Sequence, residues 1–76
     1  MNKPHLEATR KLIANKIKRA REEAGLSQRT LAETMFCDQS TISYIERGKV
    51  GVPLENLVEF SNALNKPIIY FLSDIV

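Results

Sequence analysis

The feature that most constrains this chain of 76 residues is segment 27–47, in which two short helical patterns are separated only by residues 36–38. Ser27 can cap the first helix by accepting bonds from its free N–H groups, and Leu26 can pack on Leu31 one turn into that helix. Asp38 is placed to cap the second helix, where its negative charge also suits the helix dipole. The segment therefore predicts two short helices joined by a tight turn.

A longer helix is predicted before this segment. Ile13, Ile17, Ala20 and Ala24 recur with the period of one buried helical face. The helix is expected to begin between residues 6 and 9 and to end at Gly25, because glycine readily adopts the left-handed conformation that terminates helices.

Two further helices are predicted after the segment. Pro53 suits the first turn of a helix that Asn65 closes. The apolar residues 68–72, which follow Pro67, fit a buried strand or a short helix by composition. A strand would lack a partner, because nothing else in the chain alternates with period two, so a short helix is preferred. The predicted fold class is all-α, with five helices.

Composition excludes several classes of protein. The 43% hydrophobic and 26% charged residues, with three Gly and three Pro, are ordinary for a globular chain. No apolar run is long enough for a membrane span, and the N-terminus lacks the apolar core of a secretory signal, so a cytoplasmic protein is expected. Cys37 and His5 are the only soft metal ligands, so neither a metal nor a cofactor is expected. Without a glycine-rich phosphate loop or a plausible Ser-His-Asp triad, an enzyme is not expected.

Charge is distributed unevenly along the chain. Residues 1–30 carry eight basic and three acidic side chains, a net charge of +5, whereas residues 31–76 carry three basic and six acidic ones, a net charge of −3. Such polarity would orient the molecule toward a polyanion. Solvated helix faces without a partner would give the same pattern.

The helix expected after Asp38 has two different faces. At about 100° per residue, its polar groups gather on one side and Ile42 and Ile45 fall almost opposite. Such a helix fits the major groove of DNA, whose donors and acceptors Gln, Ser, Tyr and Arg can read. Any solvent-facing helix is also polar, so this face alone does not decide the function. The polar residues are Gln39, Ser40, Ser43, Tyr44 and Arg47.

Two runs of this sequence resemble a known family. They are SQRTLAE at residues 27–33 and STISYIERGK at residues 40–49, followed by Pro53, Ala63 and Leu64. Together they resemble the phage-repressor-like helix-turn-helix family, of the Xre or Cro type, over residues 13–73. The resemblance implies a five-helix bundle of the lambda-repressor-like type in which the second and third helices form the helix-turn-helix. We expect residues 1–76 to be one such domain, with its core at residues 9–73.

The same resemblance implies a transcriptional regulator that binds near-palindromic double-stranded DNA as a homodimer. In its terms, Gln28 contacts phosphate and buttresses Gln39, while Arg47, Lys49 and the backbone amides of residues 48–51 clamp the phosphates. Arg21 and Glu46 resemble an internal ion pair that ties two helices together. The DNA-binding residues expected on this basis are Gln28, Arg29, Gln39, Ser40, Ser43, Tyr44, Arg47 and Lys49.

One residue of the turn departs from the family pattern. Phe36 stands where the family usually has glycine, and a bulky residue in a left-handed conformation costs about 1 to 2 kcal/mol. We expect either that packing of the ring offsets this strain or that the turn is rebuilt. Cys37 fills a position where the family carries a small apolar residue, and inert packing is preferred to redox sensing.

The C-terminal segment 68–76 carries seven large apolar side chains in nine residues. One short helix cannot bury them all, which favours a homodimer interface; simple core packing is the alternative. A dimer would place two recognition helices about 34 Å apart. The interface residues expected are Ile69, Tyr70, Leu72 and Ile75.

The rival to DNA binding is a protein-interaction module, for example antitoxin-like, that keeps the helix-turn-helix core. Such a protein would be expected to lose the Gln, Ser and basic groups of segment 39–47, and here they are present. Repression, activation, restriction-modification control and an antitoxin role are all compatible with the sequence.

Overall fold

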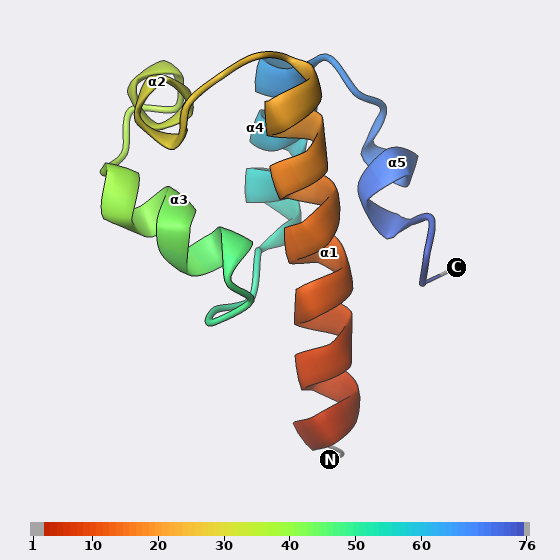
Figure 1. The fold of residues 1–76 in the computed structure, drawn as a ribbon. Coiled ribbons are helices and arrows are strands. Elements are labelled where there is room, and N and C mark those ends of the chain that lie inside the picture. Colours follow the sequence, from red (N-terminus) through yellow and green to blue (C-terminus); the bar gives the residue numbers. More distant parts are fainter. Residues whose placement is uncertain (1–2, 76) are drawn as a thin grey trace.

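The computed structural model describes residues 3–75, and they form five α-helices (Figure 1). No strand occurs among these residues. The all-α prediction is therefore confirmed, including the choice of a helix rather than a strand after Pro67. The helices are α1 (Lys3–Glu23), α2 (Gln28–Thr34), α3 (Gln39–Glu46), α4 (Leu54–Leu64) and α5 (Ile68–Leu72).

Most of the expected helix ends are present. The Ser27 side chain accepts a hydrogen bond from the Thr30 N–H at 3.0 Å, which caps α2. Gly25 and Asn65 both have positive φ, at 73° and 55°, and end α1 and α4. Asp38 occupies the N-cap position of α3 but makes no side-chain capping bond. It therefore fills the predicted position without supplying the predicted hydrogen bond.

Helix α1 is longer than its apolar pattern predicted, because it begins at Lys3 rather than between residues 6 and 9. Pro4 lies in its first turn, where the missing N–H has no partner to lose, so the helix continues through it. A helix of 21 residues is about 31 Å long. It thus runs along most of the longest dimension of the molecule, which is 35 Å.

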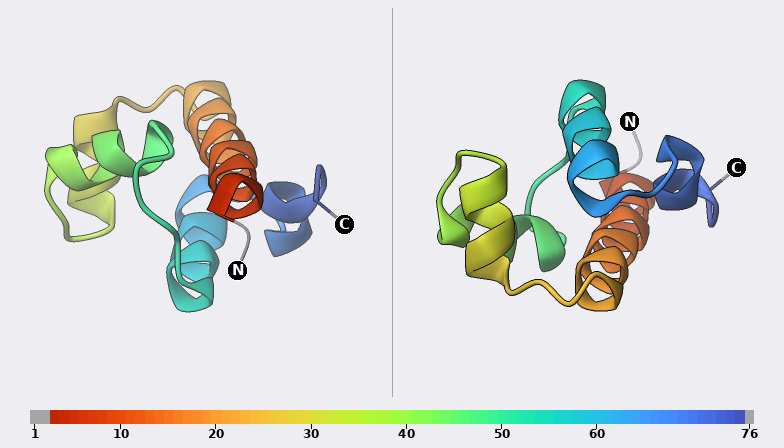
Figure 2. Two further views of the ribbon diagram at one scale, coloured as in Figure 1. Left: turned by 90° about the horizontal axis from the view of Figure 1, so that it is seen from below. Right: turned by 90° about the horizontal axis from the view of Figure 1, so that it is seen from above.

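The other helices surround α1. Helices α2 and α3 lie on one side of it, α5 lies on the other, and α4 packs between these groups (Figure 2). Ala14 of α1 is buried, although the apolar pattern did not include it. Ala24, which the pattern placed on the buried face, lies beyond the helix end and is exposed. The core residues are Ile17, Ala20, Leu31, Ala32, Ile42, Ile45, Leu57, Phe60, Leu64 and Phe71.

No helix within residues 3–75 combines the length and the apolar character needed to cross a membrane.

Candidate nucleic-acid interface

The turn between α2 and α3 keeps the left-handed conformation even though it carries a phenylalanine. Phe36 has a φ of 57°, and its side chain is 97% exposed. The N–H of the next residue, Cys37, donates to the Ala32 carbonyl at 2.9 Å and closes the end of α2. Both expected remedies for the strain are therefore wrong, since the turn is not rebuilt and the ring is not packed.

Cys37 is exposed, so the expectation that it packs inside the protein is also wrong. The pKa of its thiol is raised, first by partial desolvation of the sulfur and then by the negative charges of Asp38 and Glu59. A raised pKa lowers the fraction of reactive thiolate at neutral pH. The raised pKa therefore disfavours redox reactivity at this exposed position.

Helix α3 has the orientation that its sequence predicted. Ile42 and Ile45 are buried in the core, whereas Gln39, Ser40 and Tyr44 are exposed. The side chains of Gln39 and Ser40 make no hydrogen bond within residues 3–75. One side of the helix therefore offers hydrogen-bonding groups that the rest of the described chain leaves bare.

The end of this face is ordered by local contacts. The Arg47 guanidinium stacks on the Tyr44 ring, with 4.9 Å between its central carbon and the ring centroid. Its Nε donates to the Ser43 carbonyl at 3.3 Å. Ser43 itself is half-buried. These contacts hold Tyr44 and Arg47 side by side while leaving both exposed to solvent.

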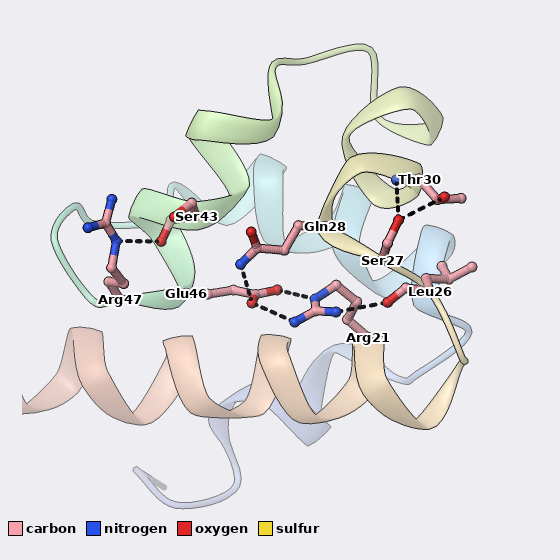
Figure 3. Close-up of polar contacts among 8 residues, drawn as sticks. All are labelled: Arg21, Leu26, Ser27, Gln28, Thr30, Ser43, Glu46 and Arg47. Carbon is pink, nitrogen blue, oxygen red and sulfur yellow. Dashed lines mark hydrogen bonds and ion pairs between the residues drawn. The ribbon is translucent and has the colours of Figure 1, made fainter.

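A buried carboxylate lies beneath this surface and joins three segments (Figure 3). Glu46, whose side chain is only 2% exposed, accepts hydrogen bonds from Arg21 Nε at 2.6 Å and from Arg21 Nη2 at 3.0 Å. Arg21 Nη1 also donates to the Leu26 carbonyl at 2.8 Å. The hydrogen bond to Glu46 raises the pKa of Arg21, against the opposing effect of desolvation. The two side chains thus form the ion pair that the resemblance implied.

Gln28 at the start of α2 belongs to the same network. Its Nε2 donates to Glu46 Oε1 at 3.0 Å, which ties Gln28 to the end of α3. The resemblance implied a contact with Gln39 at the beginning of α3 instead. The second amide N–H of Gln28 has no partner within residues 3–75. Arg29, the next residue, is exposed and lies 3.8 Å from Glu33 in a weak surface pair.

The loop after α3 offers fewer free amides than the resemblance implied. The Gly48 N–H donates to the Ile45 carbonyl at 3.0 Å, and the Lys49 N–H donates to the Tyr44 carbonyl at 3.1 Å. This pair of bonds is the usual closure of a helix that ends in a left-handed glycine, and Gly48 has a φ of 69°. Two of the four amides of residues 48–51 are therefore occupied, and the side chain of Lys49 is exposed.

Two cations that no sequence signal assigned to this surface lie against the same loop. Arg10 approaches Gly51, and Lys11 approaches Gly48. Their place depends on how α1 packs against a loop about 40 residues further along the chain, which periodicity and capping signals do not reveal.

The predicted C-terminal interface residues are not equally accessible. Ile69 is 55% exposed and Ile75 is also exposed, whereas Tyr70 and Leu72 are half-buried against the core. The Tyr70 ring is flanked by the ammonium groups of Lys16 and Lys66, at 4.9 Å and 4.7 Å from its centroid. Val76, counted among the apolar residues of this segment, lies outside the described residues.

A family model described as helix-turn-helix, HTH_3, matches residues 17–71. The restriction-modification controller protein C.AhdI from Aeromonas hydrophila is 30% identical, with a TM-score of 0.78 over 84% of this chain and 97% of that one. A comparison with curated protein sequences found no match.

Two further structures, both below 25% identity, share the fold. The clp gene regulator ClgR from C. glutamicum is 24% identical, with a TM-score of 0.79 over 90% of this chain and 94% of that one. An HTH_3 family transcriptional regulator from Vibrio cholerae is 23% identical, with a TM-score of 0.82 over 92% of this chain but 39% of that longer one.

Proposed function

The chain belongs to the HTH_3 helix-turn-helix family, and we propose that it regulates transcription by binding double-stranded DNA of a particular sequence. The observation that carries the proposal is the outer side of α3. Gln39, Ser40 and Tyr44 are exposed on this side, and the side chains of Gln39 and Ser40 make no hydrogen bond within residues 3–75. A single α-helix fills the major groove, where such groups pair with base edges.

Base reading is assigned to four residues on this side. Gln39 and Ser40 begin the helix, and the N-terminal residues of a recognition helix contact base edges. A glutamine can pair bidentately with adenine, so an A·T pair is proposed opposite Gln39. Ser43 and Tyr44 follow one turn later.

Phosphate binding is assigned to groups on both sides of α3. The free amide N–H of Gln28 and the side chain of Arg29 lie at the start of α2. Arg47 and Lys49 directly follow the end of α3, the proposed recognition helix. The unoccupied N–H groups of residues 50 and 51 add to the second group. Phosphate contacts fix the position of the protein and carry no sequence information themselves.

A homodimer is proposed through Ile69, Tyr70, Leu72 and Ile75, of which Ile69 and Ile75 are exposed. An exposed apolar patch at the end of a small domain favours self-association. Two recognition helices about 34 Å apart would then read a near-palindromic site. Sedimentation that gives a monomer at high protein concentration would contradict this part alone. We also place the protein in the cytoplasm and assign it no catalytic activity.

The test of DNA binding begins by selecting bound duplexes from a random pool, which reports sequence, symmetry and spacing together. The affinity for the selected duplex is then measured by fluorescence anisotropy at several salt concentrations. Each phosphate contact is expected to contribute a slope of about 0.9 to the fall of log affinity with log salt. A protein-interaction module that keeps only the fold would select no duplex and show no such slope.

A further inference from the structure

The first half of α1 passes alongside the loop that joins α3 to α4 (Figure 1). A Cβ atom added to Gly48 would lie 3.1 Å from Cγ of Lys11 and 3.5 Å from its Cα. A Cβ added to Gly51 would lie 3.5 Å from Nε of Arg10. The two glycines therefore allow the helix and the loop to touch, and they bring the Arg10 guanidinium against the backbone of Gly51.

The charges of these two cations are not met by an ion pair within residues 3–75. Arg10 and Lys11 are exposed and form no ion pair or hydrogen bond within residues 3–75. Other cations of the chain do have acidic partners, such as Arg21 with Glu46 and Lys66 with Glu23. The charge of Arg10 and Lys11 is thus available to a ligand.

The same loop carries two other cations, Arg47 and Lys49, that form no ion pair within residues 3–75. Arg47 is held by its hydrogen bond to the Ser43 carbonyl and its stack on Tyr44. The next two N–H groups of the loop, at residues 50 and 51, make no backbone hydrogen bond within the described chain. The loop cation cluster, which we define as Arg10, Lys11, Arg47 and Lys49, therefore lies along the same loop as these free amides. Such a combination of positive side chains and N–H donors suits a phosphate group.

We propose that Arg10 and Lys11 contact the DNA backbone, so that α1 extends the phosphate-binding surface of the loop beyond the helix-turn-helix. The proposal rests on the proposed function, because it assumes that the recognition helix lies in the major groove. The family model begins at residue 17, so both residues lie outside the part of the chain that it matches.

The size of the effect follows from counterion release. Each phosphate neutralised on duplex DNA contributes about 0.9 to the steepness with which log affinity falls with log salt. At 0.1 M salt this contribution is roughly eightfold in affinity, relative to 1 M salt. Arg10→Gln is expected to weaken binding by about that factor and to reduce the slope by about 0.9. The loss should be similar for selected and unrelated duplexes, since phosphates carry no sequence information.

Arg19→Gln is the matched control. Arg19 lies on the same helix, is exposed, and forms no ion pair or hydrogen bond within residues 3–75, although its charge attracts Glu23 one turn away. Nine residues at 100° each place it on the opposite side of α1 from Arg10. The substitution therefore makes the same change in net charge at a position turned away from the loop.

The experiment measures Kd by anisotropy for wild type, Arg10→Gln, Lys11→Gln and Arg19→Gln on one fixed duplex at four salt concentrations. Thermal melting by circular dichroism verifies that each variant is folded. The inference predicts a smaller slope for the Arg10 and Lys11 variants and an unchanged slope for the Arg19 variant. Equal slopes in all three variants would overturn it while leaving DNA binding intact. A wild type that binds no duplex at any salt concentration would instead overturn the proposed function.

Discussion

Replacing Glu46 with alanine is expected to destabilise the protein strongly. The change removes the acceptor of three hydrogen bonds, two from Arg21 and one from Gln28. It also leaves the Arg21 side chain, only 11% exposed, without its counter-ion. Breaking a buried pair in this way costs about 3 to 5 kcal/mol.

That loss is large for a chain of this size. At 0.05 to 0.15 kcal/mol per residue, 76 residues give a total stability of about 4 to 11 kcal/mol. In a domain this small, 1 kcal/mol shifts Tm by about 4 to 8 °C, so Glu46→Ala should lower Tm by at least about 12 °C. The variant is expected to be partly unfolded at 37 °C if the total lies near the lower limit.

Urea titration at low temperature, followed by circular dichroism, gives the free energy of unfolding for the variant. The double variant Arg21→Met with Glu46→Leu is the control, because it removes both charges and replaces them with apolar side chains. It should be markedly more stable than Glu46→Ala, since no uncompensated charge remains. A Tm for Glu46→Ala within 3 °C of wild type would refute the reasoning.

Three other expectations follow from the structure. Phe36→Gly should raise Tm by about 2 to 8 °C, because it relieves left-handed strain at a ring that buries nothing, and a lower Tm would mean that the ring does pack. Tyr44→Ala should relax base preference in anisotropy titrations more than it weakens non-specific binding, whereas Lys49→Ala should weaken all duplexes alike; the reverse would exchange their roles. The hydrogen bond from Lys66 lowers the pKa of Glu23, so its stabilisation is present above the ordinary pKa of 4.5 and is lost as the pH falls through the lowered value. The Tm difference between wild type and Lys66→Met should therefore shrink between pH 6 and pH 3, and a difference that stays constant would count against the pair.

The helices could be predicted from the sequence because their signals are local. Ser27, Gly25 and Asn65 each act within one turn of their own position, and each lies where the structure needs it. The start of α1 could not be found in the same way. The apolar period is weak before residue 13, and Pro4 is compatible both with a loop and with a first helical turn.

The details of the candidate site depended on distant contacts and were harder to predict. Gln28 pairs with Glu46, 18 residues away, and Arg10 approaches a glycine about 40 residues away. Neither contact leaves a trace in spacing or composition. The prediction that all four amides of residues 48–51 bind phosphate failed for a different reason. The left-handed Gly48 ends α3, and this helix end uses the N–H groups of Gly48 and Lys49 in its own hydrogen bonds.

The position of Glu46 links the stability of this protein to its proposed recognition of DNA. Its carboxylate binds Arg21 of α1 on one side and Gln28 of α2 on the other, while its backbone belongs to the last turn of α3. The Glu46 side chain therefore fixes the position of Gln28, the proposed phosphate contact, relative to the base-reading side of α3. A buried ion pair is weak evidence for stability, since apolar side chains of similar volume often replace it without loss. Apolar side chains could not, however, hold the Gln28 amide by a hydrogen bond. The pair is thus better explained by the orientation that it imposes on the two ends of the helix-turn-helix than by the free energy that it contributes.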